Sequence, residues 1–90
     1  MSAVRRSVLI RNRRGLHARA SAKFVTLAST HPVDVTVEKD GSQVAATSIM
    51  GLMMLGAAMG DTIVIHAQGD GADDAVGALA TLVEDRFGED

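Results

Sequence analysis

His17 is the residue whose type and position offer chemistry most directly. It stands where a loop ends at Gly15 and a helical pattern begins at Leu16. The first backbone N–H groups of a helix have no internal partner and attract phosphate. A phosphoryl group on the imidazole could be held by the amides of Ala18 and Arg19, and the Arg19 guanidinium adds a charged fork. Histidine suits this chemistry because its neutral ring is available near pH 7.

Other chemistry finds less support. A single histidine near a helix start is often only a surface residue. The alternative that His17 has no chemical role therefore stays open. A metal site needs several ligands, and His17, His31 and His66 have no ligand-like spacing, so no metal and no cofactor is expected. The chain has no cysteine, which excludes disulfides and thiolate nucleophiles. No histidine–serine–acid set is evident, so a turnover enzyme is the least favoured class.

The charges are unevenly distributed along a chain whose net charge is only −2. Seven of the nine basic residues lie among the first 23 positions: Arg5, Arg6, Arg11, Arg13, Arg14, Arg19 and Lys23. All eleven acidic residues lie from Asp34 onward. This asymmetry indicates that the front of the molecule meets something anionic, although a solvated basic edge is the simpler alternative. Nucleic acid is disfavoured, because the chain has no Trp or Tyr for base stacking.

The length of 90 residues fits one domain over residues 1–90. No apolar stretch approaches the roughly 20 residues needed to cross a bilayer, and the start of the chain does not read as a signal peptide. We therefore expect a cytoplasmic protein without membrane insertion.

Hydrophobic periodicity predicts four strands and three helices. Strands are expected at 4–10, 33–38, 42–46 and 62–67. The first helical pattern starts at Leu16, is rich in alanine over residues 18–28 and ends at His31-Pro32, and two further helices are expected at 49–57 and 72–87. Asp40-Gly41 predicts a tight hairpin turn between the second and third strands. The order β-α-β-β-α-β-α predicts an α+β, open-faced β-sandwich with a four-stranded antiparallel sheet and three helices on one face.

The short helix after Ser48 combines a cap with an unusual set of methionines. Ser48 is expected to cap it. Leu52 and Leu55 are expected in the core, because a helix this short cannot bury every apolar side chain. The exposed patch is then expected to consist of Ile49, Met50 and Met53, and thioether surfaces suit proteins with several partners.

Three blocks of the sequence resemble HPr, the histidine-containing phosphocarrier family of the phosphoenolpyruvate-dependent phosphotransferase system. They are Gly15-Leu16-His17-Ala18-Arg19 with Ala22-Lys23-Phe24-Val25, Val33-Asp34-Val35-Thr36-Val37 with Asp40-Gly41, and Ser48-Ile49-Met50-Gly51-Leu52-Met53-Met54-Leu55. The resemblance covers almost the whole chain. It implies that His17 takes a phosphoryl group on Nδ1 from enzyme I, beside an active-site Arg19, and passes it to enzyme IIA-type proteins.

The resemblance also implies regulation and a docking surface. In many members the serine that matches Ser48 is phosphorylated by HPr kinase/phosphorylase, and the patch next to it docks enzyme I and enzyme IIA proteins. A monomer suits such a carrier. One position departs from the family, because Ala20 stands where many members have proline. This leaves open a homologue that docks partners without carrying phosphate, and the choice between sugar uptake and a nitrogen-linked regulatory branch.

Overall fold

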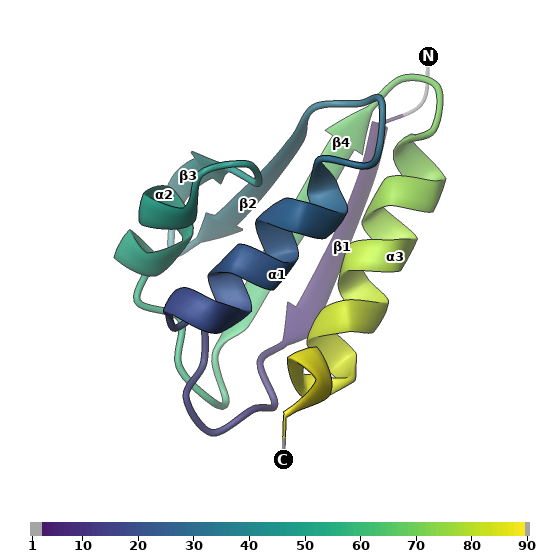
Figure 1. The fold of residues 1–90 in the computed structure, drawn as a ribbon. Coiled ribbons are helices and arrows are strands. Elements are labelled where there is room, and N and C mark those ends of the chain that lie inside the picture. Colours follow the sequence, from purple (N-terminus) through teal and green to yellow (C-terminus); the bar gives the residue numbers. More distant parts are fainter. Residues whose placement is uncertain (1–2, 90) are drawn as a thin grey trace.

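The fold is an open-faced sandwich with one sheet layer and one helical layer (Figure 1). The computed structural model describes residues 3–89. Its elements are β1 (Ala3–Leu9), α1 (Ala18–Ala28), β2 (Val35–Lys39), β3 (Ser42–Ala45), α2 (Ile49–Met54), β4 (Thr62–Gln68), α3 (Ala72–Glu84) and a 3-10 turn η1 (Arg86–Gly88). The strands are antiparallel in the order β1-β4-β2-β3, which confirms the predicted fold class.

The core fills the space between the sheet and the helices. Alternate residues of β4 are buried, and the buried face of α1 includes Ala20 and Phe24. Side chains that are less than 2 % exposed and apolar include Ile10, Phe24, Val37, Leu52, Ile63, Ile65, Val76, Leu79, Val83 and Phe87. Burying these side chains is the main force that presses α1 and α3 onto the sheet.

The hairpin between β2 and β3 turns at Asp40 and Gly41, which have φ angles of +51° and +85°. Both central positions of this turn type need positive φ, which aspartate tolerates and glycine adopts freely. The predicted hairpin is confirmed.

Several predicted boundaries were wrong by a few residues. The second strand begins at Val35 rather than at residue 33. The short helix α2 ends at Met54 rather than at residue 57, because Gly56 has a φ of +64° that no right-handed helix contains. The first helix covers Ala18–Ala28, whereas the sequence pattern placed its start at Leu16 and its end at His31-Pro32.

The prediction that the last helix runs to Phe87 was also wrong. The helix α3 ends at Glu84, and Arg86 and Phe87 take positive φ angles of +58° and +54°. Phe87 is buried, as its place in the apolar pattern indicated, but a left-handed turn brings it to the core. The apolar period correctly predicted that Phe87 is buried, but it wrongly predicted that a continuous helix reaches this residue.

Candidate functional site at the start of α1

The loop before His17 is pressed against a second loop. The backbone N–H of Leu16 donates to the carbonyl oxygen of Ala57 at 3.0 Å. Gly15 has a φ of +62°, and a Cβ atom built there would lie 2.2 Å from that same oxygen and 2.8 Å from Cα of Ala58. Only glycine fits this position, for reasons of both conformation and space. The close approach fixes where the chain enters α1.

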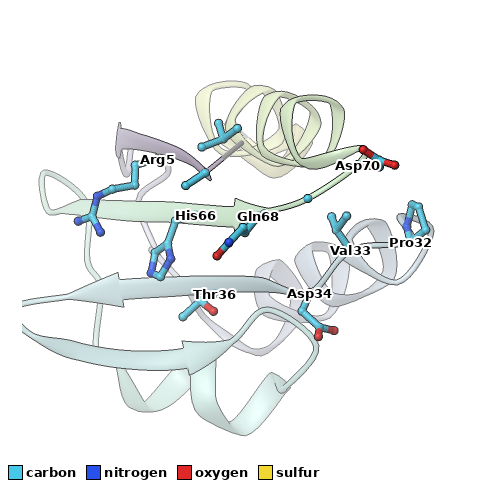
Figure 2. Close-up of a pocket in the computed structure, with 12 residues that line it drawn as sticks. Arg5, Pro32, Val33, Asp34, Thr36, His66, Gln68 and Asp70 are labelled. Atoms are coloured by element: carbon cyan, nitrogen blue, oxygen red, sulfur yellow. The ribbon is translucent and has the colours of Figure 1, made fainter. Parts of the chain in front are cut away.

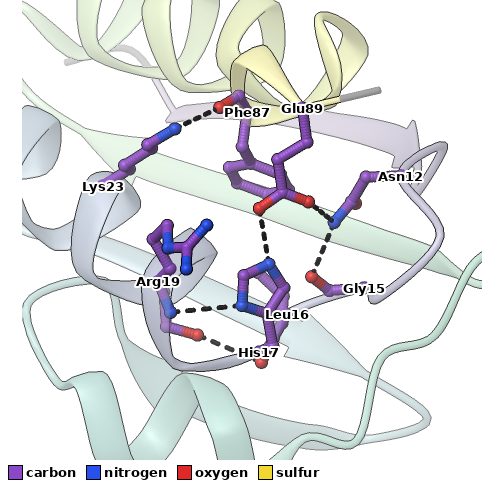
Figure 3. A network of polar contacts seen from close by, with 9 residues as sticks. Asn12, Gly15, Leu16, His17, Arg19, Lys23, Phe87 and Glu89 are labelled. Atoms are coloured by element: carbon purple, nitrogen blue, oxygen red, sulfur yellow. Dashed lines mark hydrogen bonds and ion pairs between the residues drawn. The ribbon is translucent and has the colours of Figure 1, made fainter.

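His17 is the N-cap residue of α1. Its backbone is extended, with φ −72° and ψ 178°, and its Nδ1 accepts a hydrogen bond of 3.2 Å from the backbone N–H of Arg19 (Figure 3). Its carbonyl oxygen accepts the first bond of the helix from Ser21. The imidazole therefore occupies the place where a capping side chain meets the free N–H groups of a helix.

The other ring nitrogen of His17 contacts a residue from the far end of the sequence. Nε2 lies 2.5 Å from Oε2 of Glu89, and Oε1 of Glu89 accepts a hydrogen bond of 3.0 Å from Nδ2 of Asn12 (Figure 3). Nδ2 of Asn12 also donates to the carbonyl oxygen of Gly15 at 2.9 Å. Asn12 is fully buried. The network joins the loop, the histidine and the turn after α3.

Sequence reasoning missed Asn12 and Glu89. Asn12 lies only five residues before His17, but asparagine in a loop usually signals a turn rather than a buried polar anchor. Glu89 lies 72 positions beyond His17. No pattern along the chain predicts that the turn after α3 returns to the start of α1.

Glu89 is ionised at neutral pH in this setting. Burial by itself raises its pKa, but the hydrogen bonds from Asn12 and His17 and the nearby positive charge of Lys23 outweigh this effect, so the pKa of Glu89 is lowered. A carboxyl whose pKa is lowered on folding adds stability above its ordinary pKa and loses that contribution as the pH falls.

The basic residues of the first 23 positions divide into two groups. Arg5 and Arg6 form surface ion pairs with Glu38 and Glu84, at 3.8 and 3.6 Å. Lys23 donates to the carbonyl oxygen of Phe87 at 2.7 Å. The exposed arginines nearest to His17 in sequence are Arg11, Arg13, Arg14 and Arg19.

The other candidate residues near His17 occupy the first turn of α1. Ala18 and Arg19 are its first two residues, so their amides belong to the free N–H groups of the helix. Ala20 is fully buried, and its methyl group belongs to the core cluster.

The second candidate site lies at α2. Ser48 caps this helix, and its Oγ accepts a hydrogen bond of 2.9 Å from the N–H of Gly51. Ile49, Met50 and Met53 are 40 %, 69 % and 41 % exposed, while Leu52 is fully buried. The expected division between patch and core is confirmed. Met54 is more exposed than any of them, at 79 %, and was not included in the expected patch.

The open face of the sheet carries a depression of about 850 Å³ (Figure 2). Arg5, Thr36, His66 and Gln68 line it, and no residue that contacts His17 does so. His66 faces this side of the sheet, as predicted, with Nε2 3.9 Å from a carboxylate oxygen of Glu38.

Residues 3–89 contain no group of three or more His, Cys, Asp or Glu side chains that could hold a metal ion. No helix among them is both long and apolar enough to cross a membrane.

Comparison with known proteins decides the family. The family model described as "PTS HPr component phosphorylation site" matches residues 4–85. The chain belongs to the HPr family. HPr proteins are phosphocarriers of the phosphotransferase system, and the resemblance found in the three sequence blocks is confirmed.

Individual HPr relatives match along nearly the whole chain. The phosphocarrier protein HPr of Cupriavidus necator is 44 % identical, over 96 % of this chain and 97 % of the relative. The phosphocarrier protein NPr of Shewanella violacea is 39 % identical, over 99 % and 98 %. A crystal structure of HPr from Thermoanaerobacter tengcongensis superimposes with a TM-score of 0.90 at 43 % identity, covering 100 % of this chain and 99 % of that one.

Proposed function

We propose that this HPr-family protein carries a phosphoryl group on Nδ1 of His17. The observation that carries this proposal is the position of Nδ1, which faces the backbone N–H of Arg19 at the free start of α1. An N–H group that bonds the ring nitrogen before transfer can bond a phosphoryl oxygen after it. The amide of Ala18 and the exposed guanidinium of Arg19 supply further donors to the transferred group.

The transfer is a single displacement at phosphorus between two ring nitrogens. The lone pair of Nδ1 attacks the phosphorus of a phosphorylated histidine on the donor protein. The new Nδ1–P bond forms as the donor's N–P bond breaks, and the electron pair of that bond returns to the donor nitrogen. The phosphoryl group keeps its charge, and the reverse of the same step delivers it to an acceptor.

The partners follow from the family. We propose that phosphorylated enzyme I is the donor, that enzyme IIA-type proteins are the acceptors, and that the exchange takes place between monomers in the cytoplasm. The exposed arginines around His17 favour acidic partner surfaces, because complementary charge accelerates encounter. The relatives include both HPr and NPr, so the proposal is confined to the carrier chemistry that these two share.

The proposal is tested by incubating the protein with enzyme I and phosphoenolpyruvate and then measuring its intact mass by mass spectrometry. We expect one added phosphate, lost on mild acid treatment because the N–P bond is acid-labile. A known HPr charged in the same mixture is the control. A chain that stays unphosphorylated while the control is charged contradicts the carrier proposal and favours a homologue that only docks.

We also propose that Ser48 is a substrate of HPr kinase/phosphorylase. A phosphate on Ser48 would lie at the start of α2, where negative charge is tolerated, so the fold should survive. Incubation with this kinase and ATP should add one acid-stable phosphate, which Ser48→Ala abolishes and Thr47→Ala leaves in place. If the wild-type chain gains no phosphate while a control carrier is phosphorylated in the same mixture, this prediction is contradicted.

The exposed patch of Ile49, Met50 and Met53 is proposed as the docking surface. Met53→Glu places a charge where the partner must remove water, so we expect transfer from enzyme I to become at least about tenfold slower at low carrier concentration. Thr81→Glu adds the same charge on the exposed face of α3 and serves as the control. Equal rates for the two variants, with both folded, would show that docking uses another surface.

A further inference from the structure

The exposed apolar surface of the protein consists mainly of methionine side chains. Within residues 3–89, six large apolar side chains are exposed, and four of them are the methionines Met50, Met53, Met54 and Met59. Within the same residues, the core cluster contains no methionine. A chemical change at the sulfur of any of these four methionines therefore takes place on the surface and leaves the packed core intact.

The exposed methionines lie on a segment that borders the loop before His17. Three of them belong to α2, which packs against α1 (Figure 1), and two of these three belong to the proposed docking patch. Met59 lies in the loop between α2 and β4. In that loop the carbonyl oxygen of Ala57 accepts the hydrogen bond from the N–H of Leu16. The thioethers of α2 are thus placed where a protein that reaches His17 would contact them.

A methionine thioether is oxidised by peroxides. A lone pair of the sulfur attacks one oxygen of hydrogen peroxide, and the S–O bond forms as the O–O bond breaks. The hydrogen on the transferred oxygen passes to the departing hydroxide, so the products are a sulfoxide and water. Thiolates usually compete for such oxidants, but this chain has no cysteine. Methionine is therefore the sulfur-containing residue of this chain on which peroxide acts.

We propose that Met50, Met53 and Met54 form a reversible oxidation site, and that their conversion to sulfoxides weakens the docking of enzyme I and slows phosphoryl uptake. This inference rests on the proposed carrier and docking functions. A thioether is flexible and apolar, so it adapts to a partner surface, whereas a sulfoxide is polar and binds water. Removing a sulfoxide from water without a new hydrogen bond opposes association.

The attachment of α2 to the rest of the protein does not depend on these sulfur atoms. Leu52 and Leu55 belong to the buried core cluster and hold the helix against it. The hydroxyl of Ser48 caps the helix by accepting from the N–H of Gly51. Oxidation therefore changes the polarity of the exposed face of α2, while the contacts that hold the helix in place remain.

The proposal is tested by treating the intact chain with hydrogen peroxide and then removing the excess with catalase. Peptide mapping should locate sulfoxides at Met50, Met53 and Met54. The half-saturating concentration for phosphoryl uptake from enzyme I should rise about tenfold, with the maximal rate little changed, because of the cost of removing the sulfoxides from water. The unfolding temperature should be preserved. Methionine sulfoxide reductases A and B, which act on the two sulfoxide epimers, should restore uptake.

A triple variant with Met50→Leu, Met53→Leu and Met54→Leu is the matched control. Leucine is apolar, has a similar volume and favours helix, but it has no sulfur. Met1 and Met59 remain in this variant, so it also reports any effect of their oxidation. Each protein is compared with its own untreated sample, so the starting rates of the two proteins need not agree. Peroxide treatment should leave the uptake of the triple variant unchanged.

Three results overturn the proposal: unchanged uptake by the oxidised wild type, an equal loss in the treated triple variant, or no recovery with the reductases. Resistance of the three α2 sulfurs to peroxide in the folded chain also overturns it, and this result is independent of enzyme I. Unchanged uptake after oxidation, together with slower transfer in Met53→Glu, would overturn the oxidation site alone.

A failure of the carrier function is distinguished by a second readout. If the untreated chain takes up no phosphate, its binding to enzyme I is measured by calorimetry before and after oxidation. Weaker binding after oxidation supports the oxidation site even though the carrier function has failed. Equal binding before and after, or no binding at all, overturns the oxidation site.

Discussion

Replacing His17 by asparagine should abolish phosphorylation by enzyme I and phosphoenolpyruvate completely. Asparagine is among the preferred N-cap residues, so its side chain can still accept from the free N–H groups of α1. It has no ring nitrogen to form an N–P bond. The loss can therefore be assigned to chemistry rather than to a damaged helix. Intact mass after charging, with and without acid treatment, measures the effect.

His17→Ala extends this test, and two other histidines control it. Alanine removes both the nucleophile and the cap, so it should lose all phosphate and also about 1 kcal/mol of stability. His31→Ala and His66→Ala should be charged as fully as the wild type, since neither residue contacts the His17 network. Acid-labile phosphate that persists on His17→Asn would place the carrier site on another residue.

Gly15→Ala should destabilise the protein strongly and slow phosphoryl uptake as well. Its Cβ atom would lie 2.2 Å from the carbonyl oxygen of Ala57, which Leu16 uses for its backbone hydrogen bond. Relief of this overlap must separate the two loops, and His17 moves with them. We expect a loss of about 3 kcal/mol or more in the free energy of unfolding, the sum of a strained φ and a steric clash. Urea denaturation measures it.

Gly56→Ala is a matched control for this prediction. Gly56 has a φ of +64°, close to the +62° of Gly15, but a Cβ atom there would have no neighbour within 4 Å. It should lose only the conformational part, roughly 1–2 kcal/mol. The difference between the two variants isolates the contact with Ala57. Equal losses would mean that the close approach of the loops is unimportant.

The apolar side chains of α2 show which exposures the local pattern can predict and which depend on the folded backbone. Periodicity and helix length were sufficient to predict that Leu52 is buried while Ile49, Met50 and Met53 are exposed. They were insufficient for Met54, because the helix ends there and Gly56 turns the chain away. A helix boundary depends on backbone angles that the apolar pattern does not encode.

The sequence by itself determined the fold class, the antiparallel hairpin at Asp40-Gly41, and the position of His17 at a helix start. These features depend on period, turn chemistry and capping, which are interactions between near neighbours in the chain. The sequence also indicated an anionic partner for the front of the molecule, although it could not separate ion-paired arginines such as Arg5 from exposed ones such as Arg13.

Only the tertiary structure decided how the His17 ring is held. Glu89 reaches the ring because core packing of Phe87 stabilises a left-handed turn, whereas the apolar period predicted a continuing helix. Asn12 is buried between Gly15 and Glu89, a contact that spans 77 positions. Long-range contacts of this kind form when the whole core is assembled, since no local interaction favours them over the alternatives. Local sequence signals place His17 at the start of α1. Only folding brings Asn12 and Glu89 together beside its Nε2 atom.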